Sequence, residues 1–280
     1  MDEPETLLDG IVMGESPRWH DGRLWMADWG AGEVLSIGPE GDRRVERRVD
    51  GLPISIDRDP EGRLLVVAGA ARALLREGDD GGLEELADLR PICDRPWNEI
   101  VVDARGNAFV NCIGFDLMTG EAPADGFVAV VAPDGTARRV ADGLGFPNGM
   151  AVLEDGTTLV VAESYANRLT AFTIEDDGSL RDRRTWADLG DGCPDGITVD
   201  ADGAVWFADV PNRRCTRVAE GGVVLDVVGV DRGCFACALG GDDGRTLFVV
   251  AAEWGGPDAV GGATGVVLAV RAPAAHAGRP

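Results

Sequence analysis

The chain has 280 residues, 45% of them hydrophobic, which is enough to bury a large core in one or two domains. Its formal net charge of −23 argues against a nucleic-acid partner, because the phosphate backbone would be repelled. All 26 basic residues are Arg and only two His occur, which disfavours lysine Schiff-base chemistry, His-based triads and multi-His zinc sites.

No apolar run reaches the roughly 20 residues that span a bilayer, and the N-terminus lacks a signal-peptide profile. Among the six cysteines only Cys234 and Cys237 form a C-x-x-C pair, which is weak evidence for zinc or redox work without a second pair or a nearby His. We expect free, buried thiols in a soluble cytoplasmic protein with no membrane partner. The sequence leaves the oligomeric state open.

A turn that ends in Gly and leads into an apolar strand occurs six times along the chain. The expected strands cover residues 23–27, 63–67, 107–110, 157–161, 204–207 and 245–249. The turn glycines before them are Gly22, Gly62, Gly106, Gly156, Gly203 and Gly244, with spacings of 40, 44, 50, 47 and 41 residues. Further β-rich runs follow each strand, and no segment has the pattern of a long amphipathic helix.

A period in the forties, with room for four short strands per unit, is typical of propeller blades. We therefore predict an all-β protein, a six-bladed β-propeller with four-stranded blades, as a single domain over residues 1–280. The N-terminal segment 5–12 is expected to close the ring by pairing with the last blade near residues 265–270. Such closure removes exposed strand edges.

A polar side chain stands at an equivalent place before the closing Gly in several repeats. The pairs, each eight positions apart, are Asn98 and Gly106, Asn148 and Gly156, and Asp195 and Gly203. In the first repeat Glu15 lies seven positions before Gly22, whereas the second and sixth repeats carry Ile54 and Ala236. Because the innermost strand of each blade lines the central channel, we expect the four polar side chains to meet at one mouth of that channel.

Two carboxylates and two amide oxygens form a hard-oxygen ligand set, which suits Ca²⁺, Mg²⁺ or Mn²⁺ and leaves Zn²⁺ or Fe²⁺ open. The alternative is that Asn-Gly and Asp-Gly only form turns, as they commonly do. Two such dipeptides in register, each after Pro and joined by Glu15 and Asn98, favour one bound divalent cation, with Ca²⁺ preferred.

Four short motifs resemble the SMP-30/gluconolactonase/luciferin-regenerating-enzyme-like family over roughly residues 10–270. They are Gly14-Glu15-Ser16-Pro17, Asn98-Glu99, Phe146-Pro147-Asn148-Gly149 and Cys193-Pro194-Asp195-Gly196. The resemblance implies a six-bladed propeller with one divalent cation on its axis, and many members hydrolyse lactones. It also implies that Glu15, Asn148 and Asp195 are the metal ligands and that Asn98 contacts the substrate or a metal-bound water. Glu99 departs from the family, which often has Asp there.

The expected chemistry is the opening of a lactone ring by a water near the cation, which also polarises the lactone carbonyl. Asp195 is the candidate general base, a role that the resemblance also assigns to it. No G-x-S-x-G motif occurs, so a Ser-nucleophile esterase is disfavoured. Asn98, Arg95 and Phe115 are predicted to bind the substrate, a small-molecule lactone.

Loops after the second strand of each blade are expected to set specificity, and segment 113–126 is the longest of them. The aromatic residues Trp29, Phe115, Phe146, Phe235 and Trp254 suggest a mouth more apolar than a sugar pocket needs. Two alternatives to a lactonase remain open at this point. One is a non-catalytic cation-binding propeller that serves as a regulator or scaffold, and the other is a family member with altered carbonyl chemistry.

Overall fold

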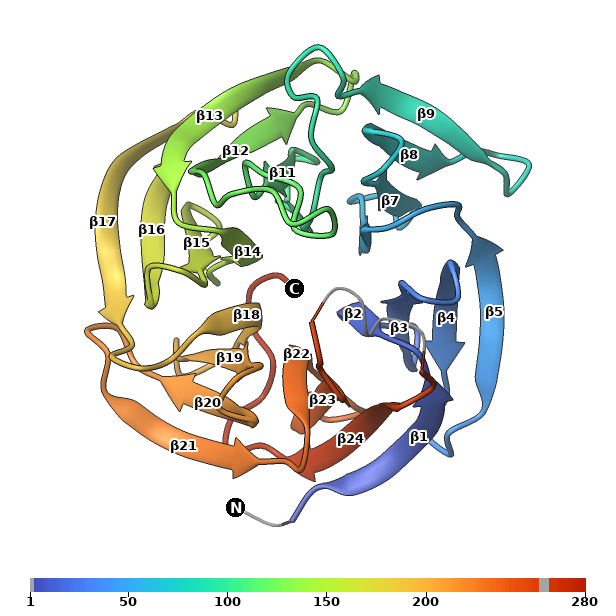
Figure 1. Ribbon diagram of the computed structural model, residues 1–280, viewed down its shortest axis with the longest axis vertical. Coiled ribbons are helices and arrows are strands. Elements are labelled where there is room, and N and C mark those ends of the chain that lie inside the picture. The colour runs from blue at the N-terminus through green and yellow to red at the C-terminus, as the bar shows by residue number, and fades with distance from the viewer. Residues whose placement is uncertain (1–2, 257–261) are drawn as a thin grey trace.

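The strands form six four-stranded antiparallel sheets arranged around a central axis (Figure 1). The computed structural model describes residues 3–256 and 262–280. Within these ranges the regular structure consists of strands, in agreement with the predicted six-bladed propeller. None of the described residues belongs to a helix that is long and apolar enough to cross a membrane.

Five blades are built from four consecutive strands, with the innermost strand first. Blades one to three contain β2 (Gly14–His20), β3 (Arg23–Asp28), β4 (Glu33–Ile37) and β5 (Arg43–Arg48); β6 (Ile54–Arg58), β7 (Leu64–Ala68), β8 (Ala73–Glu77) and β9 (Leu83–Asp88); and β10 (Ile100–Val102), β11 (Ala108–Cys112), β12 (Gly126–Val131) and β13 (Ala137–Leu144). Blades four and five contain β14 (Pro147–Val152), β15 (Thr158–Glu163), β16 (Arg168–Ile174) and β17 (Leu180–Asp188); and β18 (Pro194–Val199), β19 (Val205–Asp209), β20 (Arg214–Val218) and β21 (Val224–Gly229).

The sixth blade joins the two ends of the chain. It contains β22 (Gly233–Gly240), β23 (Thr246–Ala252), β24 (Gly265–Arg271) and, at its outer edge, β1 (Glu5–Ile11). The antiparallel pairing of β1 with β24 runs from Glu5 opposite Ala269 to Ile11 opposite Gly265. The predicted closure of the ring is thereby confirmed, and the outer strand of this blade comes from the opposite end of the chain.

Burial follows the position of each strand within its blade. The second and third strands are largely buried, as in β7 and β12, and they account for the apolar runs in the sequence. The outermost strand β5, with the sequence RRVERR, is mostly exposed or half-buried. Adjacent blades pack their apolar faces together, as where Trp97 and Phe127 of blade three meet Leu65 of blade two.

Several innermost strands contain a β-bulge near the same end. In β14 the residues Asn148 and Gly149 lie opposite the single residue Ala162, because the register shifts between Pro147 and Met150. Corresponding shifts occur in β18 between Pro194 and Ile197, and in β2 between Glu15 and Arg18. A bulge adds one residue to a strand and changes the direction of its side chains.

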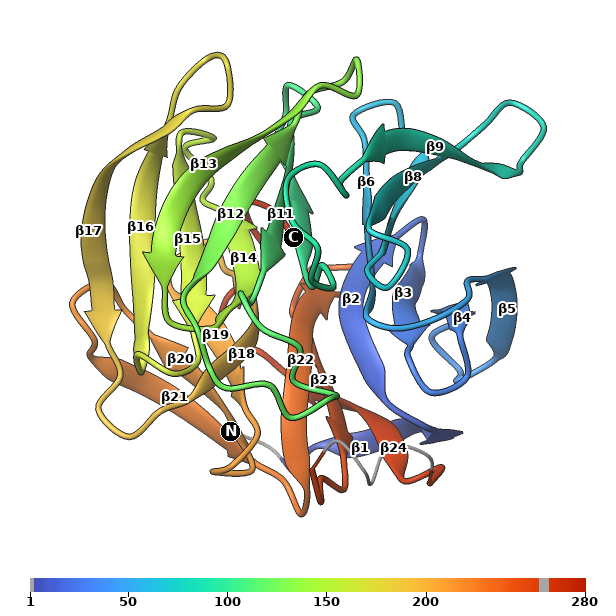
Figure 2. The same ribbon diagram turned by 45° about the horizontal axis from the view of Figure 1, so that its top comes forward.

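The residues after β24 return to the channel at the end away from these bulges. Val152 of β14 forms an isolated bridge with Arg279, and Asp200, next to β18, forms one with His276. The Thr198 hydroxyl donates to the carbonyl oxygen of Pro280 at 3.0 Å. This segment therefore lies against two innermost strands, and it ends near the axis in both ribbon views (Figures 1 and 2).

Candidate metal centre and active-site cavity

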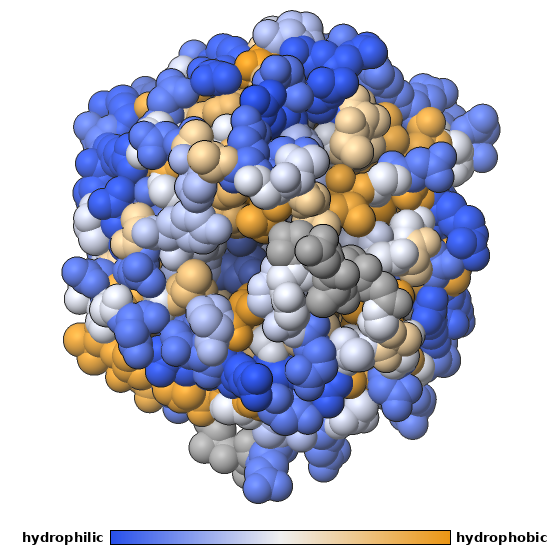
Figure 3. Space-filling model, viewed as in Figure 1, coloured by the Kyte–Doolittle hydropathy of each residue, from blue (hydrophilic) through white to orange (hydrophobic). Residues whose placement is uncertain are grey.

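A cavity of about 810 Å³ opens at the bulged end of the channel. The side chains of Glu15, Asn98, Asn148 and Asp195 all line it. They come from four different blades, so the structure brings together the four positions that the repeat spacing singled out. Figure 3 shows this face hollowed near its centre, with hydrophobic residues around the hollow.

Two glycines allow the innermost strands to approach closely at this level. A Cβ atom on Gly149 would lie 2.5 Å from the carbonyl oxygen of Asp195, and one on Gly196 would lie 2.7 Å from the Cβ of Ala236. Real Cβ atoms do not make such contacts, so a larger residue would push the strands apart. The Asn-Gly and Asp-Gly dipeptides therefore serve the packing of the strands as well as supplying polar side chains.

Hydrogen bonds fix the side chain of Asn148 and the main chain of Asn98. The Asn148 side chain donates to the Ser164 hydroxyl at 3.4 Å and also hydrogen-bonds the carboxylate of Asp195. Ser164 in turn donates to the carbonyl oxygen of Pro194 at 2.7 Å. The main chain of Asn98 is held at its carbonyl oxygen by the Ser55 hydroxyl at 2.5 Å, which leaves its side chain on the cavity.

Burial and nearby negative charges disfavour the ionised forms of Glu15 and Asp195, and so raise the pKa of both carboxyl groups. Burial, followed by the negative charges of Asp195 and Glu99, holds the pKa of Glu15 well above its usual range. Burial and then the charge of Glu99 likewise raise the pKa of Asp195, although a hydrogen bond from Asn148 acts in the opposite direction. Within residues 3–256 and 262–280 neither carboxylate forms an ion pair with an arginine.

This donor set fits a divalent cation. The carboxylates of buried Glu15 and half-buried Asp195 lack a cationic partner among the described residues, and together with amide oxygens they are the hard ligands that such ions prefer. No three His, Cys, Asp or Glu side chains gather as a metal site in the described parts of the chain. We call the part of the cavity lined by Glu15, Asn98, Asn148 and Asp195 the floor. A cation on this floor would depend on the amide oxygen of Asn148 in addition to Glu15 and Asp195.

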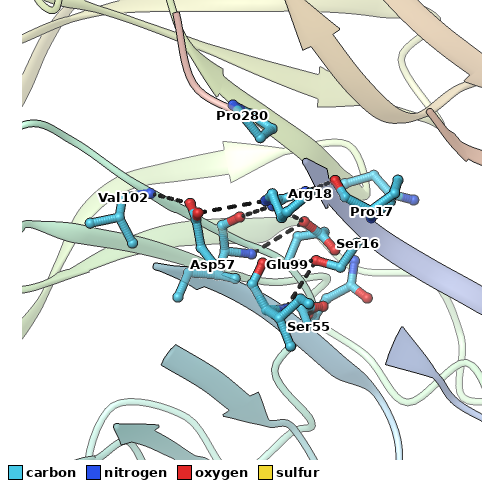
Figure 4. A network of polar contacts seen from close by, with 12 residues as sticks. Ser16, Pro17, Arg18, Ser55, Asp57, Glu99, Val102 and Pro280 are labelled. Carbon is cyan, nitrogen blue, oxygen red and sulfur yellow. Dashed lines mark hydrogen bonds and ion pairs between the residues drawn. The ribbon is translucent and has the colours of Figure 1, made fainter. Parts of the chain in front are cut away.

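A buried ionic network that no sequence pattern predicted lies beneath the floor (Figure 4). Arg18 lies 3.7 Å from Asp57 and 3.6 Å from Glu99, and it donates to the carbonyl oxygen of Ile100 at 2.8 Å. Asp57 accepts a hydrogen bond from the main chain of Val102 at 2.8 Å. Glu99, the departure from the family pattern, is thus a partner of Arg18 and does not line the large cavity.

The other predicted substrate residues have different surroundings. Phe115 lines the cavity and is buried. Arg95 is not among the described residues that line the cavity, and its guanidinium donates twice to the Glu121 carboxylate at 2.7 Å. The hydrogen bonds to Glu121, together with the charge of Asp94, raise the pKa of Arg95. Because Glu121 lies 26 residues further along the chain, no local pattern pointed to this pair.

The mouth of the cavity is formed largely by the loops that the sequence pointed to. They contribute Trp29, Ile113, Tyr165, Pro211 and Trp254 to its lining. Sequence reasoning missed a further group of lining residues, which precede the innermost strands of blades one and two: Met13, Leu52 and Pro53. These residues are separated by irregular spacings, so no repeat pattern identified them.

Comparisons with known proteins find relatives and solved structures that are similar to this protein over most of the chain. It is 29% identical to the pentonolactonase XacC of Haloferax volcanii, covering 96% of this chain and 93% of that protein. It is 27% identical to the L-arabinolactonase of Azospirillum brasilense, covering 87% and 82%. The structure of a luciferin-regenerating enzyme superposes with a TM-score of 0.83 at 20% identity, covering 98% of both chains, which concerns the fold alone. The family described as SMP-30/Gluconolactonase/LRE-like region matches residues 13–253, and the chain belongs to it.

Proposed function

We propose that this protein is a divalent-metal-dependent hydrolase that opens a lactone ring. The observation that carries the proposal is the pair of carboxylates of Glu15, which is buried, and Asp195, which is half-buried, at the bottom of an 810 Å³ cavity and without a cationic partner among the described residues. The relatives named as pentonolactonase and L-arabinolactonase support the choice of a lactone as substrate. The preferred ion is Ca²⁺, by the hard-oxygen character of the ligands.

In this proposal Glu15, Asn148 and Asp195 hold the cation. When bound, a divalent cation supplies Lewis acidity, which polarises a carbonyl group and makes a nearby water more acidic. The side-chain amide of Asn98 orients the lactone at the floor. The apolar walls of the cavity keep other water away from the reacting ester, which strengthens the electrostatic interactions of the floor.

Asp195 is the proposed general base. Its carboxylate takes a proton from the water that attacks the lactone carbonyl carbon, the ring C–O bond breaks, and the ring oxygen leaves as a hydroxyl group after accepting that proton from the Asp195 carboxyl group. The product is a hydroxy acid. The hydrogen bond from Asn148 fixes the orientation of the Asp195 carboxylate, and general base catalysis contributes about 10²–10⁴-fold to such reactions.

The proposal is tested by measuring lactone hydrolysis with and without added Ca²⁺, Mn²⁺ or Zn²⁺ after treatment with a chelator. Wild-type protein should hydrolyse a lactone only when a cation is restored. Asp195→Asn should lose about 10²-fold or more of kcat while keeping its fold by circular dichroism. Glu154→Gln is the matched control, because this carboxylate is exposed on the turn after β14, at the opposite end of the channel. Hydrolysis at an undiminished rate in Asp195→Asn would contradict the proposed role.

A further inference from the structure

Three aromatic side chains of the cavity lining lie together next to the floor. The ring of Phe146 lies 4.7 Å from that of Tyr165 and 5.6 Å from that of Phe115, and Phe115 lies 6.1 Å from Tyr165, all between centroids. We call these three residues the aromatic cluster. Phe146 stands two residues before Asn148, so the aromatic cluster begins directly beside the floor. Such spacings are those of interacting aromatic side chains.

The backbone of Phe146 is in an uncommon conformation. Its φ of 57° lies in the left-handed region, which a bulky residue seldom adopts and which costs free energy. The conformation occurs immediately before the bulge of β14 and places the ring on the cavity. An outlier of this kind next to a ligand-binding floor points to a function for the side chain.

The rest of the lining is also mainly apolar. A second aromatic pair, Phe235 and Trp254, with centroids 5.6 Å apart, lines another part of the cavity. The described lining also contains aliphatic, Met and Pro side chains, among them those of Met13, Leu52, Ile113, Met118 and Val210. These surfaces gain free energy by covering apolar parts of a ligand.

Away from the floor, the charged residues of the described lining are Asp116, Arg213 and Glu253, and the first two are hydrogen-bonded to main-chain groups. Asp116 accepts hydrogen bonds from the main chain of Met118 at 3.0 Å and of Thr119 at 3.2 Å. Arg213 donates to the carbonyl oxygen of Asp231 at 3.2 Å. A sugar lactone carries several hydroxyl groups, and each would lose hydrogen bonds to water on entering such a wall without finding an equal partner.

We propose that the preferred substrate is a lactone with an apolar substituent, an alkyl chain or an aryl group, in place of a polyhydroxylated sugar lactone. The lactone carbonyl would lie on the floor beside Asn98 and Asp195, and the substituent would lie against the aromatic cluster. This inference rests on the proposed lactonase function. The proposed substrate differs from the sugar lactones that the names of two relatives, pentonolactonase and L-arabinolactonase, specify.

The test compares five-membered lactones that differ only in their substituent. The values of kcat/KM are measured for γ-valerolactone, γ-heptalactone, γ-nonalactone and a pentono-1,4-lactone. We expect kcat/KM to rise with chain length by up to about fourfold for each methylene group that is buried. The pentonolactone should be at least tenfold poorer than γ-nonalactone. A preference for the pentonolactone, or no dependence on chain length, would overturn the proposal.

Substitutions of Tyr165 test whether the aromatic cluster causes the dependence of kcat/KM on chain length. Tyr165 is 53% exposed, so Tyr165→Ala should leave the fold intact while removing most of the chain-length dependence. Tyr165→Phe should retain that dependence, because the ring is what contacts the chain. The control is Val224→Ala, an equally exposed apolar residue on β21 at the outer edge of blade five. A chain-length dependence that persists unchanged in Tyr165→Ala would contradict the placement of the substituent.

A binding measurement distinguishes failure of this inference from failure of the proposed function. The lactams that correspond to γ-nonalactone and to the pentonolactone resist hydrolysis, and their binding is followed by isothermal titration calorimetry. The alkyl lactam should bind at least tenfold more tightly than the hydroxylated one. If neither lactone is hydrolysed but this order of binding holds, the lactonase function fails and the apolar specificity stands. Equal or reversed affinities overturn the specificity, whatever the turnover.

Discussion

The Cα of Gly149 faces the main chain of Asp195 so closely that a Cβ atom there would lie 2.5 Å from the Asp195 carbonyl oxygen. This contact sets the distance between β14 and β18 at the level of the site. We predict that Gly149→Ala separates these strands, lowers the free energy of unfolding by about 1–3 kcal/mol and reduces lactone hydrolysis at least tenfold. Thermal unfolding and steady-state kinetics measure the two effects.

The control for this substitution is Gly229→Ala. Gly229 ends β21 at the outer edge of its blade, and a Cβ atom there would meet nothing within 4 Å. We expect no loss of stability or activity in this variant. If Gly149→Ala were as stable and active as Gly229→Ala, the close approach of the two innermost strands would not matter for the site.

The metal-free protein should become more stable when one buried carboxylate is neutralised. Burial and the charges of Asp195 and Glu99 raise the pKa of Glu15, so the folded state holds this proton more tightly than the unfolded chain does. The associated stability is fully present below the unfolded pKa, about 4.3, and is lost as pH rises through the folded pKa. Glu15→Gln should therefore be more stable than wild type at pH 8 and differ little from it at pH 4, measured by denaturant unfolding after chelation.

Glu163→Gln is the matched comparison, because Glu163 is also a buried glutamate but has partners. Burial acts to raise its pKa, but hydrogen bonds from Arg168 at 2.8 Å and Thr170 at 2.5 Å outweigh it, and the pKa of Glu163 is lowered. The stability from this group is present above the unfolded pKa and is lost as pH falls through the folded pKa. Glu163→Gln should thus lose about 1–3 kcal/mol at pH 8. A gain of stability at pH 8 in both variants would show that burial alone decides the outcome.

Arg18 should stabilise the floor by compensating two buried acids. Burial raises the pKa of Asp57 and of Glu99, and the charge of Arg18 opposes the rise in both. Arg18→Met would leave both carboxylates without this partner, which costs about 3–5 kcal/mol for a broken buried pair. The loss should be larger at pH 8 than at pH 5, where the acids can take up protons, and chemical denaturation at both values measures it.

Arg44→Met serves as the control for Arg18→Met. Arg44 is exposed on β5 and lies 3.8 Å from the exposed Asp42, a pair that contributes little. The double variant Arg18→Met/Glu99→Gln should recover part of the lost stability, since it removes one of the uncompensated charges. If the single Arg18 variant unfolded like wild type, the network beneath the floor would have no structural role.

Much of the fold could be predicted because the repeat is local. Each blade contains the same order of apolar run, glycine turn and apolar strand, so Gly62 and Gly106 already show the period before any tertiary contact is considered. The closure of the ring followed from the apolar segments at the two ends. The four lining positions Glu15, Asn98, Asn148 and Asp195 followed from the same register, since equivalent residues of a propeller face the same axis.

The remaining features depend on contacts between distant residues. The spacing of seven for Glu15 and eight for Asn148 does not show that both strands are bulged. The pairing of Arg95 with Glu121 joins two loops through long, flexible side chains, whose direction has no periodic signature. The network of Arg18 and Asp57 joins innermost strands of two blades, and only the assembled ring places them together.

The most direct test of a shared cation site is calorimetric titration of chelator-treated protein with Ca²⁺ and Mn²⁺ at pH 8. We expect one cation per chain in wild type and in Glu154→Gln. We also expect affinity losses of at least tenfold in Glu15→Gln and Asp195→Asn, since substitution of mere hydrogen-bond partners of metal ligands already costs about 10–100-fold. Wild-type protein that binds neither ion, or variants that bind as tightly as wild type, would contradict the account.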